Sequence, residues 1–105
     1  MDEFISKVWK LLDLQFPLVI TDMETYLVKE GFFTNEDYEK LKSIEKTVKK
    51  EYYDGKHSKL VNSIKNGLEQ LKSIQPKKPM PPEMKIRFES LVKTMEDLAK
   101  SSETN

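Results

Sequence analysis

The chain has 105 residues, with 18 basic and 18 acidic side chains, one histidine and no cysteine. A chain of this length can form one domain around one hydrophobic core. The balanced charge creates no overall field that would draw the protein to nucleic acid or membranes. Without cysteine, neither a disulfide framework nor a thiolate site can form.

No stretch of the sequence is suited to a membrane or to export. The longest uninterrupted apolar run, residues 16–20, is far shorter than the about 20 residues of a membrane-spanning helix. Met1 is followed by two acidic residues, where a secretory signal would carry basic ones. We therefore expect an intracellular, cytoplasmic protein with no membrane partner.

Two amphipathic helices are expected in the first 30 residues. At helical spacing, seven large apolar side chains share one side and are expected to pack in the core; they are Phe4, Ile5, Val8, Trp9, Leu11, Leu12 and Phe16. Pro17 lacks an N–H group and disfavours helix at the residue before it, so we expect a second helix to begin there. One helix that continues through Pro17 with a kink is the alternative.

Residues 31–37 carry the clearest local signals in the chain. Gly31 can adopt the left-handed conformation past a helix end, which is typical of a Schellman motif. Thr34 and Asp37 have the spacing of a capping box, in which each side chain accepts a hydrogen bond from the backbone N–H of the other residue. The sequence therefore predicts a helix end, a short turn and a new helix from about residue 35.

The middle of the chain predicts two further helices, over about 35–53 and about 59–74. Their matched lengths and short connecting loop favour an antiparallel hairpin at the centre of a bundle. Gly67 lies on the apolar side of the second helix, where a glycine costs about 1 kcal/mol relative to alanine. We infer that a neighbouring helix approaches closely at this glycine.

Four prolines then interrupt the chain within residues 76–82. They favour an extended segment of about 3.1 Å per residue, which we expect to act as a rigid spacer. The last helix, over about 83–100, packs either on the core formed by residues 1–75 or on a partner, and residues 101–105 form a disordered tail. The predicted fold is an all-α bundle of four to five helices.

No set of side chains indicates an enzyme, a cofactor or a metal site. His57 is the only histidine, the side chain most used for proton transfer near neutral pH. It lies near Ser58 and Asp54, but no glycine-rich stretch offers an oxyanion hole, so we expect a surface histidine in a loop. The acidic residues within 36–39 suit the first turn of a helix better than a catalytic pair. We therefore predict no enzyme, no cofactor and no metal.

Charge is distributed unevenly along the chain. Residues 1–45 have a net charge of −5, residues 46–82 of +6 and residues 83–105 of −1. Lysines neutralise phosphates and an interleaved aromatic ring can stack on a base. Nucleic acid is therefore one candidate ligand of the segment 46–78, through Lys46, Lys49, Lys50, Tyr53, Lys56, Lys59 and Lys65. A solvated helix face is the alternative explanation for the same lysines.

Apolar stripes on every expected helix and separated charges favour a non-enzymatic protein–protein interaction module, such as a small adaptor, inhibitor or accessory regulator. Its partner would be another protein, or a second copy in a homodimer. The residues expected to bind it are Lys49, Lys50, Tyr53 and Lys56 on the basic face, and Met84, Phe88, Leu91 and Met95 on the last helix. Nucleic-acid binding is the alternative function. Small lysine-rich chains are frequent on viruses and plasmids, which suggests such an origin.

Overall fold

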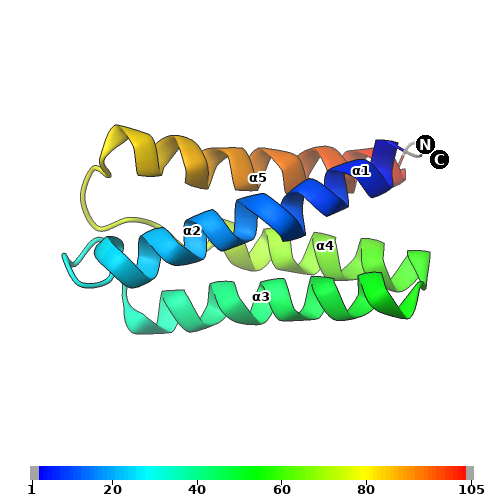
Figure 1. Ribbon diagram of the computed structural model, residues 1–105, viewed down its shortest axis with the longest axis horizontal. Coiled ribbons are helices and arrows are strands. Elements are labelled where there is room, and N and C mark those ends of the chain that lie inside the picture. The colour runs from blue at the N-terminus through cyan, green and yellow to red at the C-terminus, as the bar shows by residue number, and fades with distance from the viewer. Residues whose placement is uncertain (1–2, 104–105) are drawn as a thin grey trace.

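The computed structural model describes residues 3–103, which form helices joined by turns and contain no strand (Figure 1). The N-terminal helix is continuous and consists of α1 (Glu3–Lys10), η1 (Leu11–Gln15), α2 (Phe16–Asp22) and η2 (Met23–Leu27), where η1 and η2 are π-helical turns. The other helices are α3 (Asn35–Asp54), α4 (His57–Lys72) and α5 (Pro82–Glu103). Together they form a bundle of 41 × 22 × 21 Å.

The prediction of a separate helix beginning at Pro17 is wrong, and the described chain has four helices and not five. In η1 the backbone N–H of Phe16 donates to the carbonyl of Leu11, five residues earlier. A proline ring in an α-helix clashes with the carbonyl four residues before it. The wider π turn directly before Pro17 relieves this crowding, so the helix continues.

The two π turns also explain which side chains of the N-terminal helix are buried. Buried residues recur every four positions, at Leu11, Gln15, Val19, Met23 and Leu27. At about 100° per residue, a four-residue spacing drifts by about 40° at each step around an α-helix. Each π turn adds about one residue to a turn and offsets most of this drift. One continuous stripe therefore faces the other helices.

The turn after this helix has the geometry expected from its sequence. Gly31 has a φ of +80°, and the N–H of Phe32 donates to the carbonyl of Leu27 at 2.9 Å, as in a Schellman motif. Thr34 and Asp37 form both hydrogen bonds of a capping box, at 3.0 and 3.1 Å. The predicted junction is confirmed.

α3 and α4 lie side by side, and the chain reverses between them at Gly55 (Figure 1). The φ of Gly55 is +72°, a conformation that glycine adopts without strain. α4 begins at His57 and ends at Lys72, so it lies about two residues earlier than predicted. The expectation that His57 belongs to the loop is therefore wrong.

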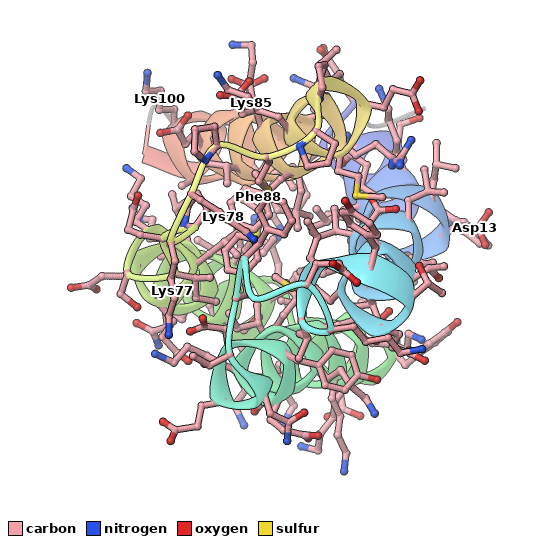
Figure 2. The ribbon with its side chains drawn as sticks, turned by 90° about the vertical axis from the view of Figure 1, so that its left-hand side faces the viewer. Asp13, Lys77, Lys78, Lys85, Phe88 and Lys100 are labelled. Atoms are coloured by element: carbon pink, nitrogen blue, oxygen red, sulfur yellow. The ribbon has the colours of Figure 1, made fainter. Side chains whose placement is uncertain are left out.

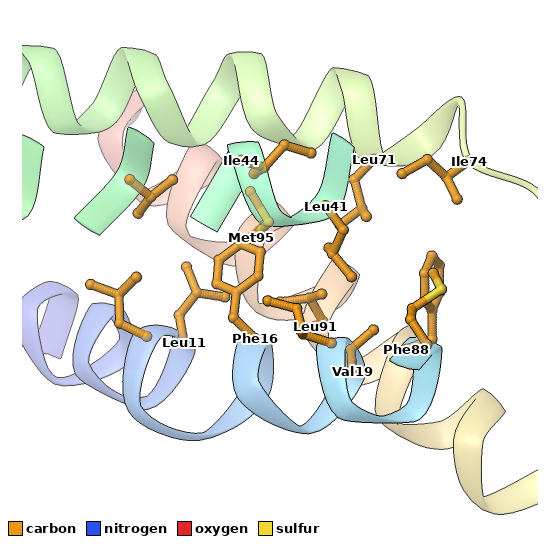
Figure 3. Close-up of a cluster of buried hydrophobic side chains, with 14 of the residues drawn as sticks. Leu11, Phe16, Val19, Leu41, Ile44, Leu71, Ile74, Phe88, Leu91 and Met95 are labelled. Atoms are coloured by element: carbon orange, nitrogen blue, oxygen red, sulfur yellow. The ribbon is translucent and has the colours of Figure 1, made fainter. Parts of the chain in front are cut away.

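One core joins the four helices, as the close-up in Figure 3 shows. Leu11 and Phe16 of the N-terminal helix, Leu41 of α3, Leu71 of α4 and Leu91 of α5 are all fully buried in it. Each helix thus contributes side chains to one shared core, where several helices together exclude water from them.

α5 packs against its own chain, with contacts to α4, α2, η1 and α1. Phe88, Leu91 and Met95, which the sequence indicated as partner-binding residues, are buried in the core, and Met84 is half-buried against it. Of the two arrangements expected for the last helix, this structure has the one within the same chain. A partner could reach the three buried side chains only if α5 left the bundle.

The segment that leads to α5 crosses one end of the bundle without helical structure (Figure 2). The N–H of Lys77 donates to the carbonyl of Phe32 at 2.9 Å, and the ammonium group of Lys78 lies 4.6 Å from the centre of the Phe32 ring. These contacts anchor the segment to the turn after η2. At its other end, α5 reaches Glu103, beyond the predicted end at residue 100; residues 104–105 of the predicted tail lie outside the described residues.

Two polar contacts tie α5 to the N-terminal helix. Arg87 donates to both carboxylate oxygens of Asp22, with Nε–Oδ2 at 2.7 Å and Nη2–Oδ1 at 3.0 Å, a bidentate pairing. These hydrogen bonds raise the pKa of Arg87 above its ordinary value. Farther along, the Nε2 of Gln15 donates to the carbonyl of Ser90 at 3.4 Å. Gln15 precedes Asp22 in the N-terminal helix, whereas its partner Ser90 follows Arg87 in α5. The two helices therefore run in opposite directions.

We predict that deletion of residues 76–105 unfolds the chain. α5 contributes Phe88, Leu91, Met95 and Leu98 to the core. Their burial contributes about 6–12 kcal/mol, comparable with the entire stability of a small domain, about 5–15 kcal/mol. Far-UV circular dichroism and the dispersion of amide resonances of the truncated chain measure the effect. A folded, soluble truncated monomer would show instead that α5 is a detachable arm.

We predict that Gly67→Ala destabilises the protein by about 1–3 kcal/mol, because it overpacks the core. A Cβ atom at this position would lie 2.7 Å from Cγ2 of Ile44 and 3.2 Å from Cε of Met95. The β-branched Ile44 has little rotameric freedom, so the contact overrides the usual preference for alanine in a helix. Urea unfolding measures the change, with Asn66→Ala on the exposed side of the same helix as the control. Stabilisation by Gly67→Ala would contradict the close packing of α3 on α4.

Candidate functional site

A cleft of about 120 Å³ lies between the N-terminal helix and the second half of α3. We call it the aromatic cleft, and it is lined by Trp9, Leu12, Asp13, Lys49, Tyr52 and Tyr53. Trp9 is 53% exposed and Tyr53 is 74% exposed. A single exposed apolar side chain is ordinary, but two large aromatic rings that line one cleft form a contiguous exposed surface of the kind that marks interaction sites.

Trp9 is exposed because the apolar side of α1 is wider than the core that it faces. The sequence places Trp9 beside Val8 on one apolar arc, and we expected both in the core. Val8 is fully buried, and the next residue along a helix points about 100° away from it. The prediction for Trp9 is therefore wrong. The excess width of the arc was the available signal that one of its members would lie outside the core.

The two tyrosines at the end of α3 are in contact. Their ring centres are 5.3 Å apart, and the ring planes meet at 70°, an edge-to-face arrangement. Tyr52 is half-buried and packs against the core, whereas Tyr53 is exposed. The cleft thus joins the core to an exposed aromatic ring.

Charges of both signs flank the aromatic cleft. Asp13 projects from η1 toward solvent (Figure 2), and Lys49 lines the opposite wall from α3. The nearby Lys50 has carboxylate neighbours on its own helix, with Nζ 3.9 Å from Glu51 and 3.6 Å from Asp54. Exposed pairs of this kind hold a side chain weakly. Lys49 and Asp13 are therefore the charges best placed to meet a ligand in the cleft.

The predicted lysines do not gather on one face. Lys49 and Tyr53 line the aromatic cleft, and Lys46 and Lys56 are exposed. Lys59 instead lines a polar groove of about 360 Å³ between α3 and α4, together with Glu51. Lys65 is half-buried on α4. Of the predicted residues, the structure thus brings Lys49 and Tyr53 together at the aromatic cleft and leaves the lysines of α4 outside it.

His57 is exposed at the first turn of α4, with its ring centre 5.0 Å from that of Phe4. The ring planes are tilted by 53°, which is an ordinary aromatic packing contact. Within residues 3–103, no three histidine, cysteine, aspartate or glutamate side chains are arranged to hold a metal ion. The aromatic cleft, and not His57, is the candidate site.

Comparison with known proteins gives no match: no family model, no curated protein and no solved structure is significantly similar to this chain. In the part of the chain that the structure describes, every helix is too short or too polar to cross a membrane.

We predict that the fluorescence of Trp9, the only tryptophan in the chain, is that of a solvated indole. Acrylamide should quench it readily in the folded protein, and unfolding in urea should shift its emission maximum only slightly. A blue-shifted emission that resists quenching would show that Trp9 is buried and that the aromatic cleft is closed in solution.

Proposed function

We propose that this chain is a non-enzymatic protein-binding module, acting as a small adaptor, inhibitor or accessory regulator, and that its partner binds at the aromatic cleft. The single observation that carries the proposal is the exposure of Trp9 and Tyr53 on the two sides of one cleft. Tryptophan and tyrosine dominate the binding energy of protein interfaces, because each buries a large area while immobilising few rotatable bonds.

The size and charge of the cleft favour a particular class of partner. A volume of about 120 Å³ is well below the about 300–1,000 Å³ of small-molecule sites, but it suits one apolar side chain from another protein. Lys46, Lys49 and Lys56 surround Tyr53 in the sequence and are exposed. We therefore propose an acidic segment of another protein that inserts one apolar side chain between Trp9 and Tyr53.

Single-stranded nucleic acid is the second candidate, favoured by two exposed rings beside Lys49. Two features favour protein instead. Asp13 lines the same cleft, where a peptide can keep its few carboxylates away from it but a phosphate at every nucleotide cannot, and Lys59 lines a different groove. A backbone that carries a charge at every nucleotide needs a continuous positive track, and the acidic residues in and around the cleft interrupt such a track.

The test is a selection of binders from a random-peptide library displayed on phage, with the immobilised full chain as target. We expect the selected peptides to combine acidic residues with one large apolar residue. Trp9→Ala should weaken their binding by about 30-fold, which corresponds to the roughly 2 kcal/mol typical of a central interface residue. Ile86→Ala, which removes an exposed apolar side chain 63% accessible on another face, is the matched control and should leave binding unchanged.

Two outcomes would contradict this function. Peptides that bind the Trp9→Ala variant as tightly as the original chain would place the binding site elsewhere. Fluorescence anisotropy with single- and double-stranded oligonucleotides provides the second check. We expect no binding at about 50 mM salt. Binding that weakens with salt with a log–log slope of about 4–6 would support the nucleic-acid alternative instead.

A further inference from the structure

A second exposed apolar surface follows the groove between the N-terminal helix and α5. Leu14, Leu18 and Ile86 are 48%, 41% and 63% exposed, respectively. They line a groove of about 200 Å³, and we call these three residues the outer strip. The outer strip lies on a different flank of the N-terminal helix from the aromatic cleft, which Leu12 and Asp13 line instead.

The floor of this groove contains a buried hydrogen-bond acceptor that the described chain does not satisfy. Gln15 is only 7% exposed, and its Nε2 donates to the carbonyl of Ser90. Its Oε1 is buried, and no donor of the described residues reaches it. Buried polar atoms are nearly always paired. Because this oxygen is buried beneath the groove surface, a donor from outside the chain reaches it only if the Gln15 side chain turns outward into the groove.

The charged side chain at the middle of the groove already has a partner. Arg87 lines the groove and is bound to Asp22. This pairing balances the charge of Arg87, so that a second similar surface can approach without strong repulsion.

The two ends of the outer strip carry opposite charges. Lys10 lines the groove one turn before Leu14, and the exposed Glu83 lies one turn before Arg87 on α5. Because the two helices run in opposite directions, Lys10 and Glu83 stand at opposite ends of the strip. A surface with a positive end, an apolar middle and a negative end is complementary to itself after a half-turn.

We propose that a second copy of this chain docks on the outer strip about a twofold axis perpendicular to the helices. The half-turn places Lys10 of each copy opposite Glu83 of the other, while Leu14, Leu18 and Ile86 pack across the axis. The second copy also presents the hydroxyl of Ser90, a donor that lines the groove near its middle. This hydroxyl can donate to Oε1 of Gln15 once the Gln15 side chain turns outward.

The contact surface is small, and its size sets the expected strength. A stable protein interface usually involves 20–30 residues from each partner, whereas the groove has about seven lining residues. The dimer is therefore weak, with a Kd on the order of 10–100 µM, and it forms and dissociates with protein concentration.

Sedimentation equilibrium of the full chain from about 10 µM to about 1 mM tests the association. The mean mass should rise from the monomer value of 12.4 kDa toward twice that value. Ile86→Asp places a charge in the middle of the strip and should abolish the rise. Because Ile86 is exposed, the variant should remain folded, which far-UV circular dichroism checks. A mass of 12.4 kDa at every concentration, or an Ile86→Asp variant that associates normally, would overturn the proposal.

A charge exchange tests the twofold arrangement itself. Lys10→Glu and Glu83→Lys should each weaken association by about tenfold, because each creates two like-charge contacts in a symmetric dimer. The double variant should regain the original affinity. Lys85→Glu is the control, since Lys85 is exposed on α5 but lines a different groove with Pro76 and Pro79. A double variant no better than the single ones would refute this arrangement.

The same measurements separate this dimer from the proposed function. Trp9→Ala removes a side chain of the aromatic cleft and should leave the sedimentation behaviour unchanged. Ile86→Asp should leave the binding of selected peptides unchanged. Loss of dimerisation in Trp9→Ala would mean that the second copy covers the aromatic cleft and would overturn the assignment to the outer strip.

Discussion

The N-terminal helix must bury a side chain at every fourth position on a backbone that ordinarily turns once every 3.6 residues. Two π turns reconcile these periods, and the arrangement of the bundle depends on this reconciliation. Without them, the buried stripe would rotate by about 160° between Leu11 and Leu27, and half of it would leave the core. The first π turn also accommodates Pro17. The same local distortion thus keeps the buried stripe facing the core and lets the helix continue past the proline.

This distortion also determines what the helix exposes. With the stripe kept toward α3, α4 and α5, the residues on its two flanks have fixed directions. Trp9 and Asp13 lie toward α3 and line the aromatic cleft, while Leu14 and Leu18 lie toward α5 and form the outer strip. Both surfaces are thus consequences of how one helix fits the core.

The parts of the fold that could be predicted from sequence are those specified within a few residues. Gly31, Thr34 and Asp37 act on neighbouring backbone groups, and their geometry is as expected. The π turns could not be predicted from a periodicity that assumes a regular helix. Distant contacts were accessible only in outline. Gly67 indicated that a neighbouring helix approaches closely, as the side chain of Ile44 does, but not which helix. Asp22 meets Arg87 across 65 positions of the chain, and neither residue type identifies its partner.

The same distinction applies to the candidate site. Alternating lysines and tyrosines indicated Lys49 and Tyr53, and both line the aromatic cleft. Trp9 was missed because an apolar arc on a helix shows that side chains avoid water without showing which neighbour covers each of them. Phe88 and Met95 illustrate the converse. Their apolar seam also suits a partner helix, but α5 folds back on its own chain and buries both side chains in the core.

Association through the outer strip would raise the affinity that a cleft as small as the aromatic cleft can reach for a partner. A single apolar side chain held between Trp9 and Tyr53 gives limited affinity, because binding must overcome the lost freedom of both molecules. In the proposed twofold dimer, the outer strip would be covered and both aromatic clefts would remain exposed, since they lie on the other flank of each N-terminal helix. Two linked clefts that engage one bivalent partner bind the second site at a raised effective concentration. Weak self-association would then make partner binding depend on the concentration of the protein itself.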